Sequence, residues 1–518
     1  MPDQKKRSTT LSAMIVMVCT FASRLLGFVR IALVSRYFGA SGTVDVFNNI
    51  FAIPNSLRKL MAEGALSSAF IPELSKAIVD DQSGEKAKKL SRNILGFQLL
   101  VLVPLTIVSI IFAPYVVKVF VSFSEPEKIL LSEKLFVWLI NYSILISVSA
   151  VLMAVLNSHR RFLVPALTPL LYSVSVITSL VCFHEQFGIY AVVIGTLVGG
   201  LAQILFQLPF YKSLNYRILP SFAFKNDEFK RVLKQWFPIL ATSSIFAITH
   251  LVAVKIASSL SDGSVSALTN AIVFWQLPSG IFAASITTVL FPKLSREASK
   301  NDYRSMTDTV QYGIKALAIL LIPSAFLFAV LGREIIALAL LNGKFTPENT
   351  ILTARVLVGY CAGMFILGVY NFSQRFFYSL RDYKTPFTAA LVTLVLDIIL
   401  SLILKNTFLE VAGLSWANTI AFTVGVIILV ASMGKKTGFG LDWKDIFSTI
   451  IKTLISLFPA IIYIYILGRF TGRDWWMAGS SLSTFAYLFL YGIGSCLIIL
   501  LMFNLLKVEF ISIIKRKR

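Results

Sequence analysis

Residues 93–120 read NILGFQLLVLVPLTIVSIIFAPYVVKVF, a stretch with Lys118 as its one charged side chain. An α-helix rises about 1.5 Å per residue, so roughly 20 apolar residues cross the ~30 Å hydrocarbon core of a bilayer. The 518-residue chain holds many stretches of this kind, which predicts an all-α polytopic membrane protein with about 14 transmembrane helices. The predicted spans are residues 11–37, 44–70, 93–120, 133–157, 162–184, 187–211, 235–260, 267–292, 311–331, 352–378, 385–405, 410–434, 446–468 and 481–506.

Composition excludes several other classes of protein. The chain is 56% hydrophobic and 14% charged, with a mean hydropathy of +0.78. Soluble domains carry roughly 25% charged residues, so neither a soluble globular protein nor a disordered chain fits. The four cysteines are far apart and lie in apolar runs, which favours packing over a disulfide framework or a metal site. No nucleotide-binding glycine loop, metal motif or nucleophile constellation is visible, so we expect no enzymatic activity.

The net charge of +22 reflects membrane topology in this interpretation, not a nucleic-acid partner. Basic residues are scattered between the apolar spans instead of being gathered in one domain. If the N-terminus is cytoplasmic, about 30 Lys and Arg fall in loops on that side and about eight on the other. Cytoplasmic loops carry such an excess, so we expect both termini in the cytoplasm.

The chain also repeats itself. Residues 70–76 (FIPELSK) have a counterpart in residues 291–296 (FPKLSR), and residues 188–191 (GIYA) have one in residues 413–417 (GLSWA). The offsets are about 217 to 225 residues and cover six spans, which predicts two six-helix lobes related by a parallel repeat with a cavity between them. The predicted domains are an N-lobe at 1–220, a C-lobe at 221–440, and a helix pair with a basic tail at 441–518.

Four arginines, Arg24, Arg30, Arg36 and Arg58, lie inside the first two spans. Arg24, Arg30 and Arg58 would each cost about 2.5–3.5 kcal/mol at the centre of a bilayer, so we expect them to face a wet cavity. A guanidinium group is permanently charged and binds phosphate through two hydrogen bonds, which favours an anionic solute or lipid as substrate. The alternative is that the arginines form structural pairs with Glu63 or Asp45.

The neighbours of these arginines allow two interpretations each. Gly27 could permit a bend between Arg24 and Arg30, while Arg36 is expected to reach the outer interface. Asp45 is either a gating group or an acidic residue that suits the N-terminus of the second span. Glu63 is either part of the charged motif or a structural salt bridge.

Two charged positions stand out in the second half of the chain. Lys255 either contributes a cation to the cavity or extends to the membrane surface. Asp397, with Thr393 one turn before it, either holds a proton or a monovalent cation, or is a buried acid hydrogen-bonded to hydroxyl groups.

These motifs resemble the signature of the MurJ (MviN) family of bacterial lipid II flippases, in the multidrug/oligosaccharidyl-lipid/polysaccharide exporter superfamily. The resemblance is carried by residues 23–30 (SRLLGFVR), 54–59 (PNSLRK) and 62–72 (AEGALSSAFIP), and residues 278–280 (PSG) extend it. It implies fourteen helices in two lobes, with a final pair that forms a groove for the lipid tail. It also implies a multi-pass protein of the bacterial cytoplasmic (inner) membrane, with a role in peptidoglycan biosynthesis, and hence in cell-wall biogenesis and cell shape.

The resemblance further implies roles for single residues. Arg24, Arg30 and Arg58 match the family's cavity arginines, and Asp45 and Glu63 match its motif acids. Asp397 and Thr393 look similar to a sodium site of some members; no other cofactor is expected. In two places the chain departs from the family pattern. The first departure is Ile31, which stands where an acid often follows the second arginine. The second is an arginine missing before the PSG motif, for which Lys255 is a hypothetical replacement.

The expected function is alternating-access flipping of lipid II, whose anionic sugar–diphosphate head group would bind Arg24, Arg30 and Arg58. Its partners would be lipid II, membrane lipids and other cell-wall synthesis proteins, but not nucleic acid. A flippase for another polyprenyl-linked glycan remains open. A MATE-like antiporter would instead need acids at cavity level. A non-transporting cell-wall scaffold would gain nothing from buried arginines.

Overall fold

The structure is a computed structural model that describes residues 2–61, 65–81, 83–472, 474–479 and 481–508. Every regular element in this part of the chain is helical, and the chain divides into two compact units, Met1–Asp262 and Gly263–Arg518. Helices suit the apolar sequence because all their backbone hydrogen bonds are made within the segment. The structure therefore confirms the predicted fold class, an all-α membrane protein.

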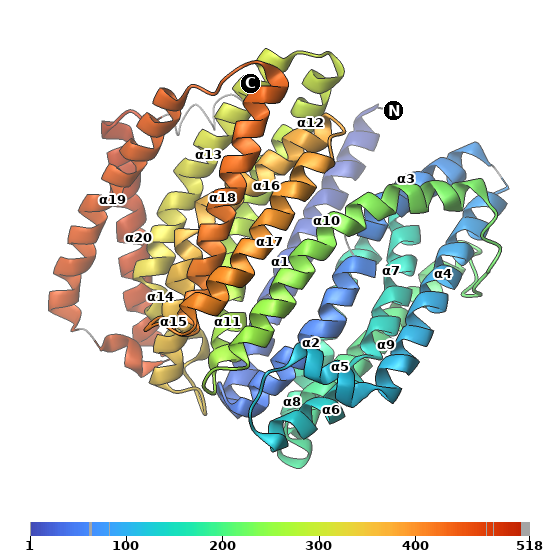
Figure 1. Cartoon of the computed structure of the whole chain (residues 1–518), viewed down its shortest axis with the longest axis horizontal. Helices are drawn as coiled ribbons and strands as arrows, with labels where there is room; N and C mark the ends of the chain where they lie inside the picture. The colour runs from blue at the N-terminus through green and yellow to red at the C-terminus, as the bar shows by residue number, and fades with distance from the viewer. Residues whose placement is uncertain (1, 62–64, 82, 473, 480, 509–518) are drawn as a thin grey trace. The chain divides into compact units, whose positions relative to one another are not determined.

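The first unit contains ten helices in its described part (Figure 1). They are α1 Pro2–Phe38, α2 Gly42–Met61, α3 Ala65–Asp80, α4 Glu85–Ile111, α5 Ala113–Phe120, α6 Pro126–Leu139, α7 Tyr142–Ser158, α8 Leu163–Phe187, α9 Tyr190–Lys212 and α10 Asp227–Ala257.

The second unit contains the remaining elements, including a π-helical turn, η1, directly after Pro278 and a short 3₁₀ helix, η2. They are α11 Ser264–Pro278, η1 Ser279–Ala283, α12 Ala284–Ser299, α13 Tyr303–Val330, α14 Gly332–Leu340, α15 Pro347–Ala362, α16 Met364–Ser379, α17 Lys384–Leu404, α18 Ala412–Thr437, α19 Trp443–Thr471, η2 Trp475–Ala478 and α20 Leu482–Leu505.

Twelve of the described helical segments are long and apolar enough to cross a membrane, or 13 if the bent pair α15–α16 counts as one span. They match the predicted spans, with two exceptions. The span predicted at 93–120 corresponds to α4, which ends at Ile111 and is followed by the separate helix α5. The span predicted at 44–70 runs over residues 62–64 outside the described part. The number 14 therefore stays a prediction. The pair α15–α16 bends by 46° at Gly363, where a Cβ atom would come within 2.3 Å of the Thr419 hydroxyl on α18.

Two of the connections between helices share the same turn. Arg160 between α7 and α8 has φ 60°, and Arg381 between α16 and α17 has φ 58°, a conformation that is uncommon outside glycine. The residue after each arginine donates its backbone N–H five residues back, from Arg161 to Leu156 and from Asp382 to Phe377. This turn is a common way for a helix to end, and it also occurs at Asn301 and at Lys507, so the predicted parallel relation stays a prediction.

Close helix packing builds the first unit around α8 and α9. A Cβ atom on Gly195 of α9 would lie 2.6 Å from the Cα atom of Val176 on α8, and one on Gly199 would lie 3.1 Å from the Cα atom of Tyr172. Glycine at these positions therefore lets the two backbones approach. The long helix α1 packs along the same α8.

Helix α10 belongs to the first compact unit, although the predicted repeat would place it at the start of the second copy. It packs against α2 and α3. The Asn49 side chain donates a hydrogen bond to the backbone carbonyl of Val254 (3.2 Å), and the backbone N–H of Ser122 donates one to the Ser258 hydroxyl (2.8 Å). The division predicted at residue 220 follows the repeat instead of this packing, and it remains a prediction.

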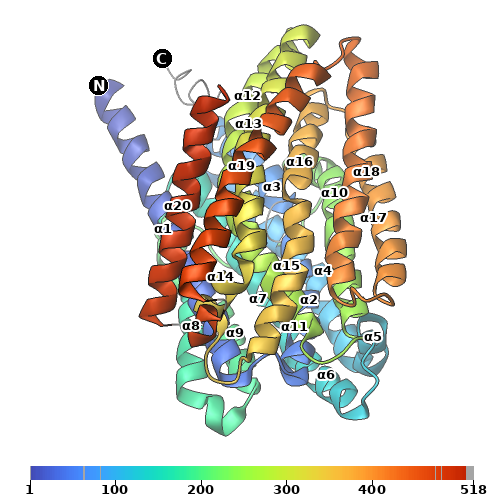
Figure 2. The same ribbon diagram turned by 90° about the vertical axis from the view of Figure 1, so that its left-hand side faces the viewer.

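In the second unit, the last two helices pack against each other, and α19 also packs along α13 (Figure 2). Asp445 at the start of α19 accepts hydrogen bonds from Lys315 (2.9 Å) and Gln311 (2.9 Å) of α13. These contacts fix one end of α19 to the repeat that precedes it.

Candidate functional site

The two arginines of α1 differ in their surroundings. Arg24 is exposed, and no interaction of its side chain is found within the described part of the chain. Arg30 is partly buried, and its guanidinium carbon lies 4.8 Å from the ring centroid of Tyr172 on α8. Helix α1 is continuous through Gly27, where an added Cβ atom would meet nothing within 4 Å.

The third arginine is held by its own helix. The Arg58 Nε donates a hydrogen bond to the Asn55 side chain (3.0 Å), one turn earlier on α2. Asp45 lies in the first turn of the same helix and is 2% exposed, a position where a carboxylate is favoured by the helix dipole. Glu63 lies outside the described residues.

Lys255 lies near the end of α10, next to the contact between Asn49 of α2 and Val254. Helices α2 and α10 pack together, but Asn49 and Arg58 are nine residues apart, or about 13 Å along a helix. The structure therefore places Lys255 beside the first half of α2 and Arg58 in its last turn. The proposed replacement role of Lys255 stays a prediction.

In the second unit, Asp397 of α17 is 3% exposed and faces α18. Its Oδ2 accepts a hydrogen bond from the Asn418 side chain (3.3 Å), while its Oδ1 has no hydrogen-bond partner among the described residues. Thr393, one turn earlier, is also buried, and its hydroxyl donates to the carbonyl of Ala389 (2.8 Å). Asp397 and Thr393 carry oxygen atoms of the type that hard cations prefer, while Asn418 turns its amide nitrogen toward Asp397.

Sequence reasoning missed two residues of these sites. The Tyr172 ring makes a cation–π contact with Arg30, and the Asn418 side chain donates a hydrogen bond to Asp397. The neighbouring glycines Gly199 and Gly200 on α9 were a signal for the first, because both leave room for large rings on adjacent helices. Nothing in the local sequence around Asn418 indicated that this residue contacts Asp397.

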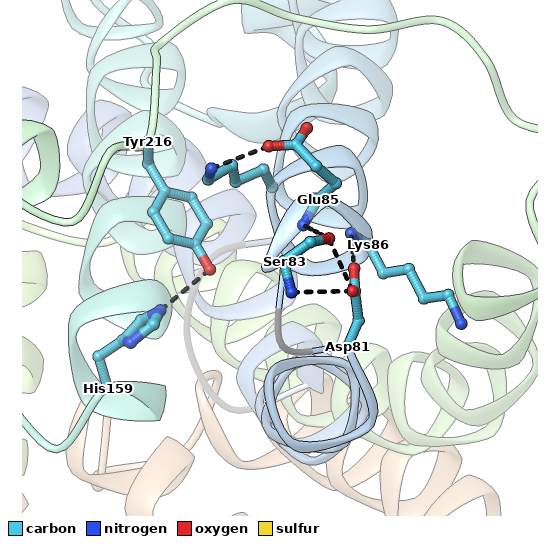
Figure 3. Close-up of polar contacts among 7 residues, drawn as sticks. Asp81, Ser83, Glu85, Lys86, His159 and Tyr216 are labelled. Carbon is cyan, nitrogen blue, oxygen red and sulfur yellow. Dashed lines mark hydrogen bonds and ion pairs between the residues drawn. The ribbon is translucent and has the colours of Figure 1, made fainter.

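Polar contacts also order the connections after α3 and α7 (Figure 3). The Asp81 carboxylate accepts hydrogen bonds from the backbone N–H of Lys86 (2.9 Å) and from the Ser83 hydroxyl (2.7 Å). The Lys86 bond, followed by the Ser83 bond, lowers the pKa of Asp81 below its ordinary value. His159 contacts the Tyr216 hydroxyl (3.0 Å), and the imidazole pKa is lowered, chiefly by burial and then by the nearby Arg161.

Membrane-crossing helices, with Arg24 and Arg30 placed within one of them, define a polytopic membrane protein. A family profile described as lipid II flippase MurJ matches residues 34–487. The chain belongs to the MurJ family.

Individual relatives agree with this assignment. The chain is similar to a probable lipid II flippase MurJ of Borreliella burgdorferi, with 34% identity over 96% of this chain and 97% of the relative. A solved structure of lipid II flippase MurJ in an inward closed conformation matches with TM-score 0.79 and 28% identity, covering 96% of this chain and all of that one. An inward-facing MATE transporter matches with TM-score 0.66 at 14% identity over 82% of this chain and 98% of its own, which shows a shared fold alone.

Proposed function

We propose that this protein is a lipid II flippase. It moves the sugar–diphosphate head group from the cytoplasmic to the outer leaflet by alternating access, and it is not an enzyme. The support is membership of the MurJ family, similarity to relatives named as lipid II flippases, and a membrane-spanning helical fold.

One observation carries the mechanism: in the described part of the chain, no carboxylate neutralises Arg24 or Arg30. Two guanidinium groups in a membrane-spanning helix are costly unless an anion compensates them. A diphosphate is suited to this task, because phosphate oxygens accept paired hydrogen bonds from arginine. Arg58, oriented by Asn55, is the proposed third ligand, and Lys255 is a candidate fourth.

The surroundings of the substrate follow from topology. In the proposed orientation both termini are cytoplasmic, as the distribution of basic residues favours. The polyprenyl tail stays in lipid beside α19 and α20. A membrane potential that is negative inside contributes about 2.3 kcal/mol per elementary charge per 100 mV toward outward movement of an anion.

We also propose that Asp397 takes up a monovalent cation or a proton during the cycle. The support is its buried Oδ1, which has no hydrogen-bond partner in the described residues, together with the buried hydroxyl of Thr393 one turn earlier on the same helix. A sodium ion present at about ten times its Kd would stabilise the folded protein by about 1.4 kcal/mol.

Thermal unfolding of the purified protein in sodium chloride and in N-methylglucamine chloride separates these choices. Sodium is expected to raise the Tm of the unchanged protein but not of Asp397→Asn. A sodium effect that persists in Asp397→Asn would exclude Asp397 as the sodium ligand. A pH-dependent Tm that disappears in Asp397→Asn, without any sodium effect, would favour the proton.

Complementation tests the main proposal. Cells depleted of their own lipid II flippase should grow when they express the unchanged chain, and should not grow with Arg24→Ala or Arg58→Ala at equal membrane abundance. Arg36→Ala is the matched control, because Arg36 is an exposed arginine near the end of the same helix α1. Full growth with both cavity variants would contradict the arginine mechanism and favour a scaffold.

Transport assays distinguish the rival substrates. Proteoliposomes that contain the unchanged protein should move lipid II between leaflets. Movement of another polyprenyl-linked glycan in preference to lipid II would redirect the assignment within flippases. Cation-coupled efflux of a drug without any lipid movement would favour the antiporter.

A further inference from the structure

Arg30 is bound in place by an aromatic ring. Its guanidinium carbon lies 4.8 Å from the centroid of the Tyr172 ring, within the range of a cation–π interaction. Arg30 is on α1 and Tyr172 on α8, and these two helices pack along each other. No other partner of the Arg30 side chain occurs in the part of the chain that the structure describes.

The ring itself has little room to move. A Cβ atom on Gly199 of α9 would lie 3.1 Å from both the Cα atom and the ring Cδ2 of Tyr172. On another side, the Tyr142 ring of α7 lies 5.7 Å from the Tyr172 ring, and Tyr142 is 4% exposed. Tyr142 in turn packs against Gly200, where a Cβ atom would lie 3.2 Å from its ring. The Tyr172 ring is therefore fixed by packing against α7 and α9.

An aromatic partner has a chemical consequence that a carboxylate lacks. A carboxylate would neutralise Arg30 and occupy its hydrogen-bond donors. An aromatic face attracts the cation through the ring quadrupole, so the charge remains available and donors at the edge of the guanidinium plane stay free. Ile31 follows Arg30 in the sequence, so the neighbouring residue supplies no acid either.

We propose that Tyr172 is a positioning residue, which orients Arg30 for the diphosphate of the substrate without neutralising it. The inference rests on the proposed function and deepens it, because it identifies what holds one of the three arginines. Tyr172 acts through Arg30 and not by contact with the substrate.

A structural role for Tyr172 in packing α1 against α8 is the competing explanation. The structure offers a matched control, because His184 of α8 stacks on Tyr37 of α1 with ring centroids 3.8 Å apart. That contact joins the same two helices but involves no arginine. Loss of helix packing alone would therefore make His184→Leu and Tyr172→Leu equivalent.

The experiment is a titration of the purified full-length protein with lipid II. Tyr172→Leu is expected to weaken binding about 3- to 30-fold, the range of a cation–π contact, while Tyr172→Phe stays within about two-fold. His184→Leu should bind as the unchanged protein does. In an Arg30→Ala background, Tyr172→Leu should cause no further loss, and a Tm measurement confirms that each variant is folded.

Three outcomes would overturn the inference alone: no loss in Tyr172→Leu, an equal loss in His184→Leu, or a full additional loss in the Arg30→Ala background. Unchanged binding by Arg30→Ala would remove that arginine from the site, and the inference with it. Absence of lipid II binding by the unchanged protein would instead overturn the proposed function on which the inference rests.

Discussion

At the residue scale, glycine decides how closely helices approach. Gly195 of α9 faces the backbone of α8, since its Cβ atom would lie 2.6 Å from the Cα atom of Val176. Backbone cannot give way as a flexible side chain can. Other glycines, such as Gly492 of α20, face open space.

Gly195→Ala is therefore expected to destabilise the folded protein by about 1–3 kcal/mol, the usual cost of overpacking. The measurement is the Tm of the purified protein. Gly492→Ala is the control, and its Tm should stay the same or rise slightly, because alanine favours a helix more than glycine does. Equal Tm values for the two variants would contradict the close approach of α8 and α9.

At the element scale, α10 is fixed to α3 by a charged contact. The Glu73 carboxylate accepts hydrogen bonds from Arg231 (3.1 Å) and Gln235 (2.9 Å), and the Glu73 side chain is 11% exposed. An ion pair of this kind is stronger than one between fully exposed groups, because water competes less for the carboxylate.

Glu73→Ala should loosen α10 from α3 and weaken their contact by about 1 kcal/mol. Hydrogen exchange in residues 69–80 and 227–236 should become faster. Asp227→Asn is the control, since the Asp227–Lys230 pair is 3.7 Å long and exposed. If exchange in both segments stayed the same in Glu73→Ala, the contact would have no role in holding α10.

The connection between α9 and α10 should depend on pH through His159. Burial, and then Arg161, lowers the pKa of His159 below 6.5, so this imidazole, which contacts Tyr216 of the connection, binds a proton more readily once the contact is lost. Stability is therefore complete above pH 6.5 and falls as the pH drops through the lowered pKa. Hydrogen exchange in residues 213–226, corrected for intrinsic rates, should accelerate on acidification. His159→Phe should remove most of this dependence; its persistence would assign it to another group.

At the scale of the whole molecule, most of the fold could be predicted because each span is a local run of apolar residues. The breaks within the helical spans could not be predicted. The bend at Gly363 depends on Thr419 of α18, and the π-helical turn Ser279–Ala283 follows a proline that the sequence interpretation placed inside one span.

The candidate site likewise contains residues that could be predicted from the sequence and residues that could not. Arg24, Arg30 and Arg58 stand out locally, because a charge inside an apolar run is costly. Tyr172 and Asn418 do not, since their partners lie far away in the sequence. Contacts of that kind become visible only once helices are packed.

The attachment of α10 to the first unit has a consequence for how the gene can be divided. Two co-expressed fragments, 1–262 and 263–518, would each keep the helix contacts of one compact unit. Fragments 1–220 and 221–518 would separate α10 from α2 and α3 during synthesis. We expect the first pair to restore growth of flippase-depleted cells better than the second. Equal growth would mean that α10 finds its partners from either fragment, so that reassembly inside the bilayer does not depend on where translation stops.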